Sequence, residues 1–340
     1  MRVSEDRFLG TLLGMAIGDA LGMPLAGMSK EAIAEEFGEI DHFITRGTPS
    51  APGAKVGEFT DETEVALCIV ESMTTNRGEV DADNIGARLQ YLSKGDSRKW
   101  LPVATLEALG RAAVDDNYHI PLDEDGPATG DVASRGVPIG LLAAVGEFDA
   151  GWLRNASEVV TRLTHGSPAA IAATTAVAYG VNLAARDVPA ERWAGETADF
   201  LETGEMAAAL RQVSGVGEDV STGDAIIRVG TSPAARESVA AAWIAAARAT
   251  SFDEAVFAAV RAGGAADTTG AIAGALAGAR FGSSGVPQGL IDDLEGRIYV
   301  SLAAPWFYRT ALHRSGLSVD VRFEGDQTGP PERPAFPPRQ

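Results

Sequence analysis

The chain has 340 residues, 45% of them hydrophobic and 22% charged, with 28 basic and 47 acidic side chains. A net charge of −19 excludes a protein that binds nucleic acid through basic patches and disfavours docking on an anionic membrane surface. The one cysteine, Cys68, cannot form an internal disulfide, and the opening residues MRVSEDRFLG lack the apolar run of a secretory signal. We therefore expect a cytoplasmic protein whose partners include neither nucleic acid nor membrane.

The spacing of apolar residues predicts a helical protein. Apolar or small residues recur every three or four positions in segments that we expect to be helices: 4–23, 61–77, 131–147, 167–184, 234–249, 252–262, 267–282 and 295–312. Only LSVDVRF near 317–323 alternates like a strand, and it is too short to build a sheet. We predict one all-α domain over residues 1–314 and a proline-rich, extended tail over 315–340.

Glycine recurs every fourth residue in two of the predicted helices. The positions are Gly10, Gly14, Gly18 and Gly22 in the first, and Gly270, Gly274, Gly278 and Gly282 in the second. Glycine inside a helix costs about 1 kcal/mol relative to alanine, so these residues need a reason. Residues four apart share a face, and a face without side chains lets another backbone approach closely. The pattern predicts a tight crossing of two central helices, which would bring together residues at their N-terminal ends.

Two helix starts far apart in the chain resemble each other. Residues 57–64 read GEFTDETE and residues 263–269 read GGAADTT, so each has glycine, then neighbouring threonine and acidic residues, then a helix. One interpretation is capping, in which Asp61 and Glu64 form a capping box. The other is a joint site, because Asp, Glu and Thr oxygens suit Mg²⁺ and helix N-termini suit phosphate. Asp19 favours the joint site, because a charge inside an apolar helix needs a partner, a cap or a cation.

Five segments together resemble the ADP-ribosylglycohydrolase family. They are GTLLGMAIGDALGMP, FTDETEVAL, TGDVASRGVPIGLLAA, LTHGSP and GGAADTTGAIAGALAGA, in the family's order, between residues 5 and 310. The resemblance implies a compact, largely orthogonal all-α bundle with a central cleft. It also implies an enzyme that uses two Mg²⁺ ions to cleave the bond joining ADP-ribose to a protein side chain or a small acceptor.

The resemblance assigns metal ligands, with departures from the family's pattern. The residues at the metal positions are Thr60, Asp61, Glu62, Asp267 and Thr268. Glu62 replaces the family's second aspartate, Ala265 replaces the first aspartate of the second motif, and Ala26 stands where many members have glutamate. Because lost carboxylates leave two cations poorly screened from each other, we expect at most one well-occupied Mg²⁺, or none.

The catalytic assignment follows from the same segments. Cleaving a ribosyl bond needs stabilisation of an oxocarbenium-like centre and a base for water. We expect Asp61 to anchor the ribose hydroxyls, directly or through a cation, and Glu62 to activate water. The expected substrate contacts are Asp19, Gly263, Gly264, Arg135 and His165. Two of these have structural alternatives, namely a salt bridge of Arg135 with Asp131 and a helix-start role for His165.

The sequence therefore predicts a hydrolase of N- or O-ribosyl bonds that acts on a small-molecule or protein-linked ribosyl or ADP-ribosyl substrate. One alternative is a ribosyl N-glycosidase of a nucleotide-derived metabolite with one metal or none. Another is a family member that binds ADP-ribose without catalysis. Nothing in the sequence indicates an oligomeric state.

Overall fold

The computed structural model describes residues 3–44, 54–115, 117, 118, 123–217 and 219–317. Within these ranges the chain forms helices and no strand, as predicted. The α-helices are α1 (Glu5–Gly22), α2 (Lys30–Phe37), α3 (Asp61–Thr75), α4 (Ala82–Leu92), α5 (Val103–Asp115), α6 (Gly130–Ala133), α7 (Gly136–Ala144), α8 (Ala150–Arg162), α9 (Pro168–Ala185), α10 (Ala190–Leu201), α11 (Glu205–Ser214), α12 (Thr222–Val229), α13 (Ala235–Arg248), α14 (Phe252–Val260), α15 (Ala266–Phe281), α16 (Gln288–Asp293) and α17 (Arg297–Arg314). Short 3-10 helices are η1 (Met23–Leu25), η2 (Asp96–Lys99) and η3 (Ser283–Gly285).

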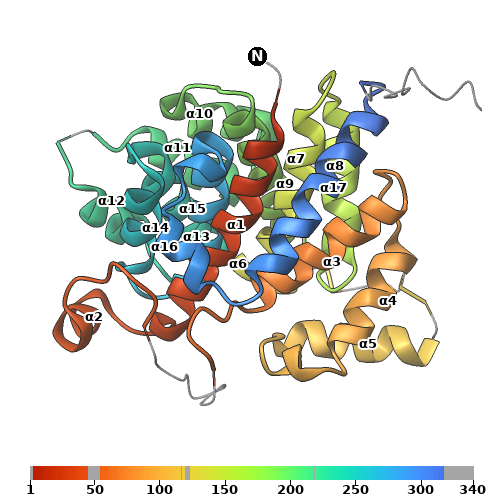
Figure 1. Cartoon of the computed structure of the whole chain (residues 1–340), viewed down its shortest axis with the longest axis horizontal. Coiled ribbons are helices and arrows are strands. Elements are labelled where there is room, and N and C mark those ends of the chain that lie inside the picture. The colour runs from red at the N-terminus through yellow and green to blue at the C-terminus, as the bar shows by residue number, and fades with distance from the viewer. Residues whose placement is uncertain (1–2, 45–53, 116, 119–122, 218, 318–340) are drawn as a thin grey trace, which may run out of the picture.

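Helices α1 and α15 pack against each other along their length at the centre of the molecule (Figure 1). The glycine ladders form this contact, because a Cβ atom added at Gly18 would lie 1.9 Å from the carbonyl oxygen of Gly270, and one at Gly14 would lie 2.2 Å from that of Gly274. The tight crossing is confirmed. The ends that meet differ from the prediction, because the helices run antiparallel and the C-terminal half of α1 lies beside the N-terminal end of α15.

The other helices surround this central pair. Helix α17 packs on α1 and α3, and α9 packs on α7, α8 and α15. A single cluster of buried apolar residues extends from Val3 to Ala311. By length and composition two helical stretches could cross a membrane, Glu5–Leu25 and Pro168–Ala185, but 94% and 72% of the respective apolar windows are buried inside the protein. Core helices give the same pattern.

Two details differ from the predicted elements. The helix expected over 131–147 is two helices, because the backbone N–H groups of Arg135 and Val137 donate to carbonyls three residues back, and the α-helical pattern is interrupted there. The spacing also missed the more polar surface helices, which bury only one narrow face: α2, α4, α5, α8, α10, α11, α12 and α16. From residue 318 on, the predicted tail and most of the weak strand signal lie outside the described residues.

Candidate active site at the junction of α1, α3, α6 and α15

Asp19 connects the centre of the fold to the start of α3. Its Oδ2 accepts hydrogen bonds from the backbone N–H groups of Thr60 (3.0 Å) and Thr63 (3.2 Å) and from the Thr63 hydroxyl (2.6 Å). A carboxylate of α1 therefore caps α3, since Thr60 makes no side-chain cap of its own. The predicted Asp61–Glu64 capping box is wrong, because Asp61 is the first helical residue and not the cap.

Glu62 joins two helix starts that are far apart in the sequence. Its Oε1 accepts a 2.5 Å hydrogen bond from the Thr268 hydroxyl at the start of α15, and its Oε2 contacts the Thr60 hydroxyl. The residue is only 3% exposed. The expected convergence of the two similar turns is therefore present, and the longer side chain of Glu62 spans the distance between them.

The Thr60 hydroxyl lies between two carboxyl groups. It is 2.8 Å from Asp19 Oδ1 and also contacts Glu62 Oε2, yet a hydroxyl has one hydrogen to donate. One of the two carboxyl groups must therefore hold a proton to satisfy both contacts. In agreement, burial followed by the charge of Glu62 raises the pKa of Asp19 well above its usual value, and burial raises the pKa of Glu62.

Three further carboxyl groups complete the cluster, and all are partly exposed. Burial and then the charge of Glu62 raise the pKa of Asp61, and the same causes raise the pKa of Asp267 to about 7. Asp131, at the start of α6, adds to the shifts of both and of Glu62. We name Asp19, Asp61, Glu62, Asp131 and Asp267 the carboxylate cluster.

Sequence reasoning considered Asp131 only as a partner for Arg135, and it missed Thr63 and Ser134. A usable signal was present for Asp131, because it lies in the first turn of α6, directly after Thr129–Gly130, in a segment that carries the family resemblance. Thr63 lies three residues after Thr60, the spacing at which one acceptor reaches both backbone N–H groups of a helix start. Ser134 lies beside α3, with its hydroxyl 3.5 Å from the Glu62 carbonyl.

Arg135 lies near the cluster but is not paired with it. It is 2% exposed, and its Nη1 donates to the carbonyl of Val160 at 3.1 Å. The salt bridge with Asp131 that we considered does not form within the described part of the chain, where Arg135 Nε also has no hydrogen-bond partner. Burial lowers the pKa of Arg135, and the charges of Asp131 and Asp61 oppose that shift.

His165 is buried in the loop between α8 and α9. The Thr164 hydroxyl lies 2.8 Å from its Nδ1, and its backbone N–H donates to the carbonyl of Thr161. Burial, followed by the positive charge of Arg135, lowers the pKa of His165 to about 4. The ring is therefore neutral at pH 7 and 5% exposed, which favours the structural role that we considered for it.

Three of the expected substrate contacts have structural roles. Asp19 is completely buried and uses its oxygens on the start of α3. The N–H of Gly263 donates to the carbonyl of Val260, and that of Gly264 donates to the carbonyl of Met28 at 2.8 Å, so neither is free for a phosphate. Both glycines have a positive φ, and a Cβ at Gly264 would lie 1.9 Å from the carbonyl oxygen of Thr231.

The side chains as arranged do not fit a preformed Mg²⁺ site. The hydroxyls of Thr60 and Thr268 both contact Glu62, whose carboxylate fills the space between them. Throughout the residues that the structure describes, no group of three or more His, Cys, Asp or Glu side chains is placed to hold a metal ion. Ala265, where the family pattern has a carboxylate, is a buried residue at the start of α15. Magnesium binding stays a prediction.

Comparison with known proteins identifies the family. The sequence profile of the ADP-ribosylglycohydrolase family matches residues 2–316, and the chain belongs to that family. It is 30% identical over 310 residues to an uncharacterized protein of Archaeoglobus fulgidus, covering 89% of this chain and 96% of the relative. A shorter match, 38% identical over 81 residues, covers 24% of this chain and 26% of the ADP-ribosyl-[dinitrogen reductase] glycohydrolase of Rhodospirillum rubrum.

A solved structure has the same fold. It is titled an ADP-ribosylglycohydrolase-related protein complex and superposes with a TM-score of 0.71 at 31% identity, covering 90% of this chain and 98% of that chain. The all-α bundle of the ADP-ribosylglycohydrolase type is thereby confirmed, and family membership supports a hydrolase of glycosidic bonds.

Proposed function

We propose that the protein hydrolyses the bond between a ribosyl group of the ADP-ribosyl type and an N- or O-linked acceptor. The observation that carries the proposal is the carboxylate cluster, in which four helices of a glycohydrolase-family fold bring acidic side chains together. Raised pKa values are typical of catalytic carboxyl groups, and family membership supplies the class of bond.

The reaction needs what such a cluster can supply. Water attacks the anomeric carbon, the C–N or C–O bond to the acceptor breaks, and the departing acceptor gains a proton while the water loses one. A cluster that holds both protonated and ionised carboxyl groups at neutral pH contains the acid and the base for these transfers. Its negative charge also stabilises the oxocarbenium-like centre that forms as the bond breaks.

The exposure of each carboxylate side chain indicates its role. Asp61 and Asp267 are the partly exposed members at the two facing helix starts, so we assign them the contacts with ribose and water. Glu62 is buried, and both of its oxygens are in contact with threonine hydroxyls. We therefore propose that Glu62 is a positioning residue that fixes the two starts, rather than the base expected from the sequence.

Two alternatives have specific support. The departures at Glu62, Ala265 and Ala26 favour a shifted specificity, namely a ribosyl N-glycosidase of a nucleotide-derived metabolite with one metal or none. The same departures favour a protein that binds ADP-ribose without catalysis. Asp61, Asp267 and their threonine neighbours favour an enzyme, because they are retained and converge.

The test is release of the acceptor. The full chain is incubated with ADP-ribosyl-arginine, ADP-ribosyl-serine and simple nucleosides, each with Mg²⁺ and with a chelator, and the products are separated by chromatography. We expect hydrolysis of at least one substrate, and a loss of kcat of about 10²–10⁴-fold in Asp61→Asn and in Asp267→Asn. Glu35→Gln, on the exposed face of α2, is the matched control and should be unchanged.

A second comparison separates the two roles of Glu62. Glu62→Ala should lower kcat to a residual, measurable turnover, while the far-ultraviolet circular dichroism stays that of a folded helical protein. If Glu62 is a general base, its loss should remove one limb of the pH profile. If it is a positioning residue, its loss should lower kcat without shifting the pH profile. Binding of ADP-ribose without any release of acceptor from the listed substrates would favour the non-catalytic alternative, and a fully active Glu62→Ala enzyme would refute both roles.

A further inference from the structure

One face of α17 carries large apolar side chains that are exposed in the described structure, and Arg309 lies over one of them, with its Cζ 5.0 Å from the centroid of the Trp306 ring. Ile298 is 70% exposed, Leu302 is 63% exposed and Trp306 is 59% exposed, and the four-residue spacing puts them on one side of the helix. Tyr299, beside them, is 43% exposed. A contiguous apolar surface of this kind marks an interaction site more often than a chance exposure.

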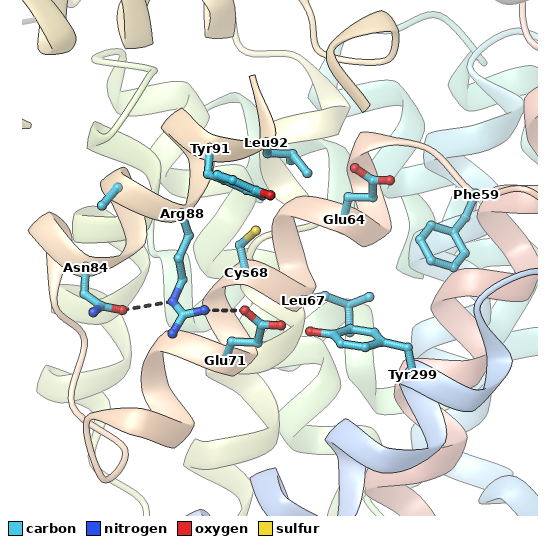
Figure 2. A pocket seen from close by; sticks show the side chains of 11 residues that line it. Phe59, Glu64, Leu67, Cys68, Glu71, Asn84, Arg88, Tyr91, Leu92 and Tyr299 are labelled. Carbon is cyan, nitrogen blue, oxygen red and sulfur yellow. Dashed lines mark hydrogen bonds and ion pairs between the residues drawn. The ribbon is translucent and has the colours of Figure 1, made fainter. Parts of the chain in front are cut away.

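Two adjoining cavities lie along this face and form one groove. The first, of about 670 Å³, lies between α3, α4 and α17, and Figure 2 shows Tyr91, Tyr299 and Phe59 at its rim with Leu67 and Cys68 between them. The second, of about 480 Å³, continues past Leu302 and Trp306. The cavities share Glu71, Arg88 and Tyr299. We name this surface the α3–α17 groove.

The groove combines aromatic rings with negative charge. Arg88 is tied to α3 and α4, because it contacts Glu71 through Nη1 and donates to Asn84 through Nε at 3.0 Å. Glu64 and Glu71 give the lining of the first cavity a net negative charge after Arg88 is counted, whereas Arg309 lies over Trp306 at the other end of the groove. Burial raises the pKa of the Cys68 thiol to about 12, and the charges of Glu71 and Glu64 add to this shift. A fitting occupant is extended, apolar and positively charged.

The chain's own C-terminal sequence has that chemistry. Residues 318–340 lie outside the described part of the chain, and residues 329–339 read GPPERPAFPPR. This stretch holds two overlapping P-x-x-P patterns, at 331–334 and 334–337, and its two basic residues, Arg333 and Arg339, outnumber its one acidic residue, Glu332. Proline-rich sequences favour the polyproline II conformation, and aromatic-lined grooves with acidic groups bind such sequences.

We propose that the α3–α17 groove binds the proline- and arginine-rich sequence 329–339 of the same chain. The described chain ends at Leu317, just after α17, so this segment starts from the same helix that forms the groove. From Leu317 back to Tyr299 the distance along the helix is about 27 Å, at 1.5 Å per residue. Fully extended, a segment of the length of 318–331 spans at most about 46–50 Å, so the chain is long enough for the sequence to reach the groove.

Disulfide trapping in the full chain tests the proposal. In a Cys68→Ser background, Ala87→Cys places a thiol in the exposed lining of the groove and Ala335→Cys places one inside the second P-x-x-P pattern. The control pair joins Ala335→Cys with Ala34→Cys on the exposed side of α2. We expect the groove pair to oxidise within one chain about tenfold faster than the control pair, at a rate independent of protein concentration. Equal rates would overturn the proposal, and so would disulfide-linked dimers that increase with concentration, which indicate a second copy in the groove.

Quenching of Trp306 fluorescence provides a second readout that needs no particular contact. Trp306 emission is isolated as the difference between the parent chain and Trp306→Phe. If the sequence covers the groove, the triple variant Pro331→Gly, Arg333→Glu and Pro334→Gly should expose Trp306 and raise its acrylamide quenching constant about twofold. The matched control Asp320→Gly, Asp326→Gly changes the same segment outside the patterns and should leave quenching unchanged. Equal quenching in the triple variant and the parent chain would overturn the proposal.

Discussion

The hydroxyl of Thr268 donates a 2.5 Å hydrogen bond to Oε1 of Glu62 and thereby joins the first turn of α15 to the first turn of α3. The two residues are 206 positions apart in the sequence. Because Glu62 also contacts Thr60, one carboxylate holds both helix starts through threonine hydroxyls that the family resemblance assigns to metal ions. The side chain that departs from the family's aspartate thus occupies the space between the two threonines predicted to be ligands.

This arrangement predicts how metal binding can be changed. In the double variant Glu62→Asp, Ala265→Asp the shorter side chain no longer reaches both threonines, and a second carboxylate is added at the start of α15. We expect the double variant to bind Mg²⁺ about tenfold or more tightly than the parent chain in calorimetric titration, because Mg²⁺ prefers carboxylate oxygens and water in octahedral geometry.

The control for this experiment is Glu62→Asp with Ala34→Asp, which adds the same charge on the exposed face of α2. It should bind Mg²⁺ no better than Glu62→Asp alone. Equal Mg²⁺ affinity in the parent chain and the double variant would mean that Glu62 and Ala265 do not determine metal binding here.

Removing the cap that Asp19 provides should destabilise the protein. Asp19→Ala leaves the buried N–H groups of Thr60 and Thr63 without their acceptor, and an unsatisfied buried donor costs about 1–3 kcal/mol. We expect the free energy of unfolding to fall by about 3 kcal/mol in urea titrations followed by circular dichroism, with Glu35→Ala as the surface control. A loss below about 0.5 kcal/mol, the size of an ordinary surface effect, would show that water or neighbouring groups replace the cap.

Sequence reasoning reached the correct fold because the informative residues are regularly spaced. The two glycine ladders have one physical use in a helical protein, close backbone contact, and the contact is present. The relative direction of the two helices could not be predicted in the same way, because two glycine-lined helix faces can pack in parallel or in antiparallel orientation. The prediction therefore brought the wrong ends together, although Asp19 still meets the start of α15 through Thr60 and Glu62.

The convergence of the two helix starts was predictable from the sequence, whereas the catalytic, substrate and metal roles stay predictions. The starts of α3 and α15 meet as expected, because Thr268 donates to Glu62 and the charge of Asp267 acts on Asp61. The roles of Asp19, Gly263 and Gly264 could not be predicted from the spacing of residues in the sequence, because these roles depend on which backbone carbonyl or N–H group each residue contacts in the folded protein. That information exists only once helices from different parts of the chain are packed.

The helix crossing gives a prediction with an internal control. Gly18→Ala would put a Cβ 1.9 Å from the carbonyl oxygen of Gly270, and backbone atoms cannot move aside cheaply, so we expect a loss of at least about 3 kcal/mol or failure to fold. Gly110→Ala, in α5, meets no atom within 4 Å and should stabilise the protein by about 0.5–1 kcal/mol. Thermal unfolding measures both, and equal melting temperatures for the two variants would contradict the packing.

His165 predicts a specific dependence of stability on pH. Its pKa is about 4 in the folded protein and about 6.5 in an unfolded chain, so between these values the unfolded chain binds a proton that the folded protein does not. The stability that the neutral ring contributes is complete above about pH 6.5 and decreases as the pH falls toward 4, by about 3 kcal/mol in all. Arg135, whose charge opposes protonation of the ring, and Asp131, whose charge favours it, face this group.

The carboxylate cluster shifts in the opposite direction and must be separated from this effect. Because the pKa values of Asp19, Asp61 and Asp267 are raised, the folded protein binds their protons more tightly, and their contribution to stability increases as the pH falls. We therefore compare the parent chain with His165→Asn, which keeps a polar group beside Thr164 and cannot titrate. The free energy of unfolding of the parent chain relative to the variant should decrease by about 3 kcal/mol from pH 7 to pH 4 in urea titrations. A difference that stays constant over this range would show that His165 titrates normally in the folded protein.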